Sequence, residues 1–337
     1  MSKTAKIIIG AIVVILVIWG LSTLGEKNTS PAADEPIKIG VIAPLTGPVA
    51  DYGEEIRKGI ISANIASSNI QFVFEDDKCD PKEAVSAFKK LTEFEKVQFI
   101  IGPACGSPQE AIVPLLKNKS ILAVVPVAAT TKLYAESGNN FFNIQYSLED
   151  ESKFIAERIF ASGHKKVALV SYANAFSKVH ADSFRSNFEG EITLDEVIVD
   201  ENSDVATIVT KIKSAKVEAI YSPDISFFFA NGLIKLNQQK VSVPVYGTYV
   251  VELPAVRTLV PDVIYSFPGD LGGEEGAVYN LSKQVAELLT PIVEECQSTY
   301  DCVKQKLDSS GKFDENGVYR RQIILKQIKN NIPSILQ

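Results

Sequence analysis

The sequence is poor in the residues that metal and nucleophilic chemistry need. It has only two histidines, His164 and His180, in 337 residues. His164 precedes an apolar run that reads as a strand, and His180 falls inside a predicted helix, so neither is placed to act as the base for a cysteine. No His and Cys spacing matches a metal-ligand pattern, and the motifs of phosphate loops, nucleophile elbows and dinucleotide-binding turns are absent. We expect a protein that is not an enzyme and uses no cofactor and no metal.

Positive charge is also scarce. The 34 Lys and Arg residues are outnumbered by 41 Asp and Glu residues, and the net charge is −7. Lys89-Lys90 and Arg320-Arg321 are only pairs, which is too few to neutralise a run of phosphates. We expect no nucleic-acid partner.

One long uncharged run stands near the N-terminus. Residues 7–24 are 18 mostly apolar positions, about the length that crosses a bilayer as a helix. Lys3 and Lys6 precede the run, which favours a cytoplasmic N-terminus and an extracytoplasmic body. We expect residues 1–36 to form an uncleaved single-pass anchor in the cell membrane and a polar tether. The alternative is a signal peptide, whose cleavage would leave a secreted or periplasmic protein.

All four cysteines lie in the part of the chain expected outside the cytoplasm, where thiols oxidise. Cys296 and Cys302 are six positions apart and can meet across a corner between two helices. This leaves Cys79 for Cys105. Of the three possible pairings we therefore expect Cys79–Cys105 and Cys296–Cys302.

From residue 37 onward, short β-branched runs alternate with amphipathic stretches. The runs 97–101 (VQFII) and 121–125 (ILAVV) are largely apolar, as expected of parallel strands covered by helices on both faces. A similar series of elements starts after residue 151. The pattern predicts an α/β protein with two Rossmann-like lobes, parallel sheets and a cleft between the lobes, preceded by the N-terminal transmembrane helix. The expected domains are 1–36 (membrane anchor and tether), 37–146 (lobe 1, first part), 147–266 (lobe 2, main part), 267–318 (lobe 1, return) and 319–337 (lobe 2, closing strand and C-terminus).

Ligands of such folds bind outside the carboxyl ends of the strands. At one of these ends, Ser107 followed by Pro108 reads as a helix cap and a first helical residue, so the free amides of the helix tip would face the cleft and attract an anion. A carboxylate could accept hydrogen bonds from the Gly106 and Ser107 amides and from the hydroxyls of Ser107 and Thr130. A Ser107 that only caps its own helix is the simpler alternative.

Five stretches carry a resemblance to a known family. They are IKIGVIAPLTGPVADYGEEIRKG, FEDDKCDPKEAV, FIIGPACGS, VPVAATT and FDENGVYRRQIILKQIKN. Over about residues 37–330 the chain resembles the branched-chain-amino-acid type of ABC-transporter substrate-binding proteins, which are leucine/isoleucine/valine-binding-like and have the type I periplasmic binding protein fold. The resemblance implies two lobes that close on a small ligand and deliver it to ABC permease subunits.

The resemblance also implies one half of a ligand site in the first lobe. Tyr52 matches a wall tyrosine of the family, and Gly106, where the family often has serine, opens the loop that holds the ligand α-carboxylate. The residues that match ligand-binding positions of the first lobe are Tyr52, Gly106, Ser107, Ala128, Ala129 and Thr130. In this segment a backbone carbonyl of Ala128 and the Thr130 hydroxyl would hold the ligand ammonium and carboxylate.

The second lobe departs from the family pattern. Phe176 stands where a tyrosine is frequent, Ile225 lies near another aromatic position, and Tyr249 occupies the position of the acid that pairs with the ligand ammonium. Asp224 could replace that acid. If it does not, a free α-amino acid is disfavoured, because a buried ammonium without a carboxylate partner is costly.

Two functions fit these observations. The first is an extracytoplasmic solute-binding receptor of an ABC importer, which captures a branched-chain-like amino acid or a related small carboxylate by lobe closure. The alternative is a ligand-sensing ectodomain of the same fold that signals through a partner protein. A hydrolase is disfavoured, because the sequence offers no nucleophile with a base.

Overall fold

The computed structural model describes residues 35–63, 69–200, 203–223, 227–260, 262–272, 275–330 and 332–336. The expected transmembrane anchor at residues 7–24 lies outside these ranges. None of the helices within them is both long enough and apolar enough to cross a membrane. The unit Ile37–Gln337 contains two sheets, which we treat as the centres of two lobes.

The first lobe is built on a five-stranded parallel sheet in the order β2-β1-β3-β4-β5. Its strands are β1 (Ile37–Ala43), β2 (Ile70–Asp76), β3 (Phe99–Ile101), β4 (Leu122–Val125) and β5 (Phe141–Asn143). Its connecting helices are α2 (Ala50–Ser62), α3 (Pro81–Lys89), the π-helix η1 (Lys90–Phe94), α4 (Gly106–Leu116) and α5 (Lys132–Glu136).

The apolar strands of this sheet have both faces covered. Ile100 and Ile101 are neighbours in sequence but belong to different hydrophobic clusters, and the same is true of Val124 and Val125. Successive side chains of a strand point to opposite faces. A strand with helices on both sides therefore needs an apolar residue at every position, which confirms the interpretation of the runs VQFII and ILAVV.

The second lobe is built on a seven-stranded sheet in the order β12-β11-β10-β9-β8-β6-β7. Its strands are β6 (Lys166–Tyr172), β7 (Glu191–Ile198), β8 (Ala219–Tyr221), β9 (Val245–Gly247), β10 (Asp262–Pro268), β11 (Ile323–Lys329) and β12 (Ile332–Ile335). Strands β6 to β10 are parallel, whereas β11 and β12 pair antiparallel. Its helices are α6 (Leu148–Ala161), α7 (Ala175–Asn187), α8 (Val205–Ala215), α9 (Phe227–Gln238), the 3-10 helix η2 (Tyr249–Glu252) and α10 (Pro254–Arg257). The predicted α/β class with parallel sheets is confirmed, and the antiparallel edge is an addition.

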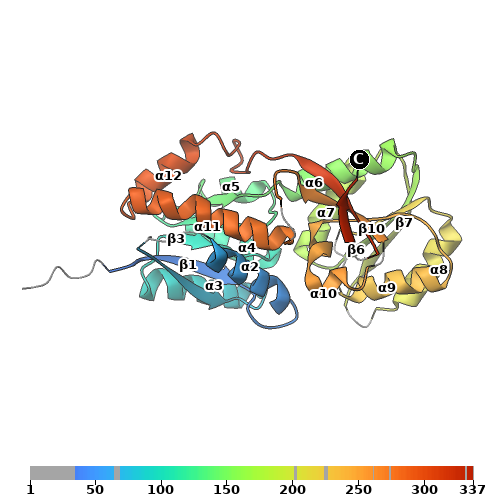
Figure 1. Cartoon of the computed structure of the whole chain (residues 1–337), viewed down its shortest axis with the longest axis horizontal. Helices are drawn as coiled ribbons and strands as arrows, with labels where there is room; N and C mark the ends of the chain where they lie inside the picture. The colour runs from blue at the N-terminus through green and yellow to red at the C-terminus, as the bar shows by residue number, and fades with distance from the viewer. Residues whose placement is uncertain are drawn as a thin grey trace, which may run out of the picture. The chain divides into compact units, whose positions relative to one another are not determined.

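The chain passes between the two sheets three times. It leaves β5 for α6, returns after β10 to α11 (Ala277–Glu295) and α12 (Tyr300–Ser309), and then enters β11. Helix α11 packs along α2, and Figure 1 shows the orange α11 beside the blue elements of the first lobe. Gly59 permits this approach, because a Cβ there would lie 2.3 Å from the Tyr279 carbonyl oxygen. The residue boundaries of the domains stay predictions.

Both expected disulfides are present. Cys79 pairs with Cys105 and Cys296 with Cys302, with Cα atoms 5.5 and 5.6 Å apart. The second bridge joins the end of α11 to the start of α12, which is the expected corner between two helices. The first bridge ties the loop after β2 to the residue that precedes α4, so it fixes the ligand-facing edge of the first lobe.

Candidate ligand-binding site

The first-lobe side of the site is held by side chains at the end of β2. The Asp76 carboxylate accepts hydrogen bonds from the Leu45 amide at 2.9 Å and the Thr46 amide at 3.3 Å. The neighbouring Asp77 is buried, and its Oδ1 accepts from the Cys79 amide at 2.9 Å. Burial raises the pKa of Asp77 to about 6. These bonds and the Cys79 disulfide hold the loops after β1, β2 and β3 together.

The start of α4 differs in one detail from the sequence expectation. The N-cap residue is Cys105 rather than Ser107, and the helix begins at Gly106. Ser107 is therefore inside the first turn, where it is exposed, and the prediction that it caps the helix is wrong. The Cys105 side chain is committed to the disulfide and makes no cap hydrogen bond. The amides of Gly106 and Ser107 remain the first amides of the helix, and these have no partner within a helix.

The two lobes meet at this helix tip. A Cβ built on Gly106 would lie 3.3 Å from the Cβ of Ala175 and 3.5 Å from the backbone nitrogen of Phe176. Ala175 is the first residue of α7, whose N-cap Asn174 accepts a hydrogen bond from the Ser177 amide at 2.7 Å. The first turns of two helices, one from each lobe, thus adjoin, and both helix dipoles present their positive ends there.

The segment after β4 lines the same edge. Ala128, Ala129 and Thr130 are buried, with Thr130 at 9% exposure. The Ala129 carbonyl accepts a hydrogen bond from the Leu148 amide at 3.1 Å, so it ties the first-lobe edge to the start of α6. Among the described residues, no hydrogen-bond partner is found for the Thr130 hydroxyl, so this group is available to a ligand.

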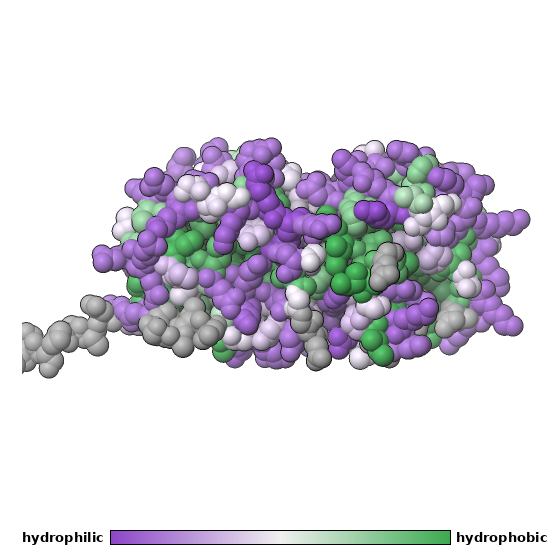
Figure 2. Space-filling model, turned by 45° about the horizontal axis from the view of Figure 1, so that its top comes forward, coloured by the Kyte–Doolittle hydropathy of each residue, from purple (hydrophilic) through white to green (hydrophobic). Residues whose placement is uncertain are grey.

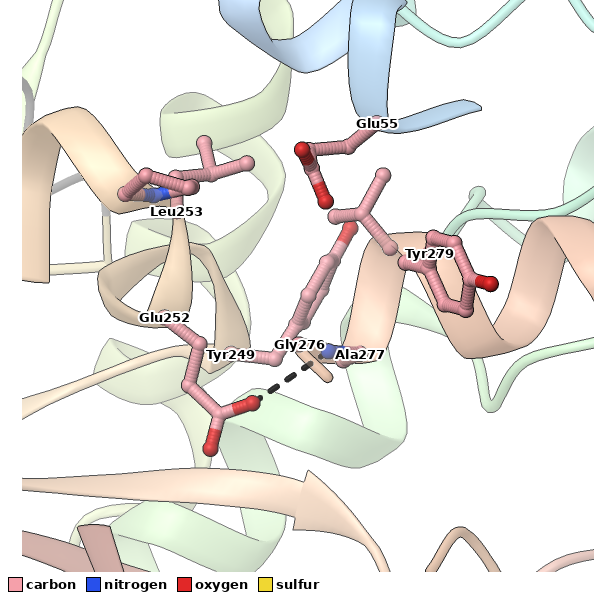
Figure 3. Close-up of a pocket in the computed structure, with 9 residues that line it drawn as sticks. Glu55, Tyr249, Glu252, Leu253, Gly276, Ala277 and Tyr279 are labelled. Carbon is pink, nitrogen blue, oxygen red and sulfur yellow. Dashed lines mark hydrogen bonds between the residues drawn. The ribbon is translucent and has the colours of Figure 1, made fainter. Parts of the chain in front are cut away.

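Two residues predicted for the site, one from each lobe, contact each other. The hydroxyl oxygens of Tyr52 in α2 and Tyr249 in η2 are 3.5 Å apart. Tyr249 is 1% exposed, and burial raises its pKa well above 10. Figure 3 shows Glu55 of α2 directed toward Tyr249. A neutral phenol that Tyr52 of the other lobe contacts therefore stands where the resemblance predicts an acid.

A shallow pocket lies beside Tyr249, with about 190 Å³ of empty space, part of it open solvent. On one side it is bounded by Glu252, which is nearly buried. The Glu252 carboxylate accepts from the Tyr265 hydroxyl at 2.5 Å and from Lys326 Nζ at 2.9 Å. It also accepts from the Ala277 amide at 3.2 Å (Figure 3). Because Ala277 is the first residue of α11, Glu252 joins the second lobe to the helix that returns to the first.

A buried polar cluster lies behind the second-lobe wall. Glu151, in the first turn of α6, places Oε1 3.2 Å from the Tyr146 hydroxyl and also accepts from the Ser266 hydroxyl. Its Oε2 is 3.3 Å from Nε2 of His180 in α7. Both Glu151 and His180 are 0% exposed. Burial raises the pKa of Glu151 to about 8 and lowers the pKa of His180 to about 3.

The structure brings two pairs of the predicted site residues into contact. Tyr52 lies against Tyr249, and Gly106 lies against the backbone of Phe176. Asp224 and Ile225 lie outside the described residues. Glu151 and Glu252 were not predicted from the sequence. Glu252 is an acid inside the otherwise apolar stretch YVVELPAV, which is a signal that could have found it, whereas Glu151 ends the acidic run LEDE and carries no such signal.

Comparison with known proteins supports the same fold. A model of the periplasmic binding protein family matches residues 36–258, about two thirds of the chain. The chain belongs to the periplasmic binding protein family. A Leu/Ile/Val-binding protein from Rhizobium johnstonii is 29% identical to this family member over 204 residues, which are 57% of this chain and 55% of that protein. A Leu/Ile/Val-binding protein homolog from Brucella melitensis is 31% identical over 56% of this chain and 55% of that protein.

The chain is thus similar to the branched-chain amino acid type of substrate-binding protein, and it spans about half the length of these relatives. Among solved structures, a leucine binding protein from Thermotoga maritima superposes with a TM-score of 0.78 at 16% identity, covering 89% of this chain and 98% of that one. A Rhodopseudomonas palustris solute binding protein in complex with benzoate also gives 0.78, at 18% identity over 89% and 95% of the two chains. At these identities the likeness shows the fold.

Proposed function

We propose that this periplasmic binding protein captures a small carboxylate, either a branched-chain-like amino acid or a related acid, between its two lobes and delivers it to ABC permease subunits. The observation that carries the proposal is the meeting of the first turns of α4 and α7 at Gly106 and Ala175. Two adjoining helix N-termini each contribute a positive potential that attracts an anion. The protein binds the ligand and closes its lobes on it, and it makes no covalent bond.

The residues divide by role. We assign the amides of Gly106 and Ser107 and the hydroxyl of Thr130 to the carboxylate. Tyr52 and Tyr249 supply the aromatic walls, with Phe176 beside them. The Ala128 carbonyl is the acceptor for an ammonium, because the Ala129 carbonyl is already used by the Leu148 amide.

A second ligand class is favoured by one observation. Tyr249 is neutral and buried at the position where the family has its ammonium-pairing acid. A carboxylate without an ammonium avoids the cost of burying an unpaired cation. The relative that binds benzoate has the same fold. Aromatic or aliphatic monocarboxylates are therefore candidates beside amino acids.

The cellular location and the domain boundaries are part of the same proposal. We place the lobes outside the cytoplasm, with residues 1–36 as membrane anchor and tether. We propose the boundaries 37–146, 147–266, 267–318 and 319–337 for the alternation between lobes. A full chain that fractionates with membranes would support the anchor, and a body released as a shorter chain would support the signal-peptide alternative.

A ligand screen tests the function. Thermal unfolding is followed with each of the twenty amino acids and with their deaminated acids and benzoate, and hits are measured by calorimetry. A ligand at about 100 times its Kd stabilises the fold by about 2.7 kcal/mol. Binding should be lost or weakened in a Thr130→Val variant whose own unfolding is unchanged. A folded protein that binds none of these compounds would contradict the proposal.

A further inference from the structure

The Glu151–His180 pair lies directly behind the second-lobe wall. The ring of Phe176 packs on His180 with centroids 4.6 Å apart. The backbone of Tyr249 lies close enough to the Glu151 carboxyl to lower its pKa, against the larger effect of burial. Both residues that we assign to the second-lobe wall are therefore in contact with this pair. The pair also lies beside Ser266 and Tyr221, which are at the carboxyl ends of β10 and β8, the edge where ligands of such sheets bind.

A proton held between the two side chains would satisfy both of them. Oε2 of Glu151 and Nε2 of His180 are 3.3 Å apart, and among the described residues no hydrogen-bond partner is found for either atom. Both side chains are fully buried. A carboxylate and a neutral imidazole facing each other would leave an unpaired negative charge in a low-dielectric interior, which is strongly disfavoured. With one shared proton, the pair has no net charge and both atoms are satisfied.

The groups around the pair are neutral or engaged elsewhere. The Tyr146 and Tyr221 hydroxyls contact Glu151 and His180, and burial raises the pKa of both phenols well above 10. Burial also raises the pKa of Tyr249 in η2 well above 10. Arg321 precedes β11 on the third crossing between the sheets and interacts electrostatically with Tyr146. Its Nη1 lies 3.6 Å from Oδ1 of Asp270, so its charge is already paired. Among the described residues, the titratable and polar groups that face the pair are Tyr146 before α6, Ser152 in α6, Tyr221 from β8, Tyr249 from η2 and Ser266 from β10.

We propose that the Glu151–His180 pair sets the charge of the second-lobe half of the site and so decides whether a bound carboxylate also carries an ammonium. With its shared proton the pair is neutral and admits a plain carboxylate. Without that proton it is an anion behind Tyr249, where it repels a carboxylate and attracts an ammonium. This inference rests on the proposed capture of a small carboxylate and names the group that selects its class.

The charge of the pair changes within an accessible pH range. Burial raises the pKa of Glu151 to about 8 and lowers that of His180 to about 3, so the pair keeps one proton between these values. Above pH 8 the proton leaves and the net charge becomes −1. By Coulomb's law, a unit charge within about 10 Å of the ligand in an effective dielectric near 20 changes affinity by roughly tenfold or more.

Binding of two matched probes tests the selection. Calorimetry on the full chain in detergent measures the Kd of leucine and of 4-methylpentanoate, which is leucine without its ammonium, at pH 6.5 and 8.8. In the wild type, 4-methylpentanoate should weaken roughly tenfold relative to leucine as the pH rises. In Glu151→Gln, which keeps the shape and cannot ionise, this ratio should stay constant. An unchanged ratio in the wild type, or the same change in Glu151→Gln, would overturn the inference.

A ligand-independent measurement separates this inference from the proposed function. The chain has two histidines, so their NMR titrations are easily assigned with a His164→Gln variant. His180 should stay uncharged from pH 4.5 to 7 and respond near pH 8, when Glu151 loses the proton. A His180 that gains its charge near pH 6.5 would overturn the inference even if both probes bind. If neither probe binds, the proposed capture of a branched-chain ligand fails, and the His180 titration alone decides the inference about the pair. The same titration decides it if the Glu151→Gln variant does not fold.

Discussion

The buried Glu151 makes the stability of this protein fall with rising pH in a defined window. Its pKa rises from 4.5 in the unfolded chain to about 8 in the fold, so between these values the folded state holds a proton that the unfolded state has released. The free energy of unfolding then falls by about 1.4 kcal/mol per pH unit. His180, lowered from 6.5 to about 3, has the opposite effect between those values, because there the unfolded state holds the extra proton.

The effects of Glu151 and His180 on the free energy of unfolding cancel between pH 4.5 and 6.5. Above pH 6.5 only the effect of Glu151 remains. From pH 6.5 to 8 the pair should therefore remove about 2 kcal/mol of stability, and above 8 the loss should stop. Urea unfolding of the wild type and of Glu151→Gln at quarter-unit pH steps measures this as the difference between the two curves. Glu157→Gln, at an exposed position of the same helix, is the matched control and should track the wild type.

Two results would refute the reasoning. One is a difference between wild type and Glu151→Gln that is constant from pH 6.5 to 8, which would mean that Glu151 is already ionised in the fold. The other is a Glu157→Gln curve that behaves like Glu151→Gln, which would mean that any charge removed from α6 has the same effect.

Four further outcomes are expected. Replacing both Cys79 and Cys105 by Ala should lower the free energy of unfolding by about 3.5 kcal/mol, since a loop of 26 residues is released; an unchanged urea midpoint would contradict this. Thr130→Val should weaken carboxylate binding by about 1–3 kcal/mol, seen by calorimetry, and equal affinity would remove the hydroxyl from the site. Gly106→Val, whose Cβ would lie 3.3 Å from that of Ala175, should hold the lobes apart; small-angle scattering should show a larger radius, and an identical radius with full binding would contradict lobe contact. Glu252→Gln should cost about 1–3 kcal/mol of stability by weakening the bonds to β10, β11 and α11, and no change in unfolding would show that these bonds contribute little.

Much of the fold is encoded in local patterns. Alternation of apolar strands with amphipathic helices predicted the α/β class, because each element must bury its apolar side against a neighbour. Asp80 before Pro81 is a local start signal for α3, and the Asp80 side chain accepts from the Lys82 and Glu83 amides. The short strands β5 and β12 gave little signal, since few residues carry their pattern and their partners come from elsewhere in the chain.

The site was predictable only where it coincides with a loop at a strand end. Gly106 and Thr130 follow apolar strands, so their position at the sheet edge followed from the order of elements. The cap at Ser107 was wrong because the Cys79 disulfide and the turn at Cys105 start the helix earlier. Whether Tyr52 would reach Tyr249 depended on how far the two lobes approach, which no local pattern records.

The sequence by itself determined the alternation of elements, the disulfide partners and the loops that face the cleft, because these depend on periodicity, spacing and strand polarity. Only the tertiary structure decided that Glu151 and His180, 29 positions apart, share one buried contact behind the ligand wall. The reason is physical: burial is a property of the packed interior, and it is the removal of both side chains from water that moves their pKa values and makes them hold one proton together.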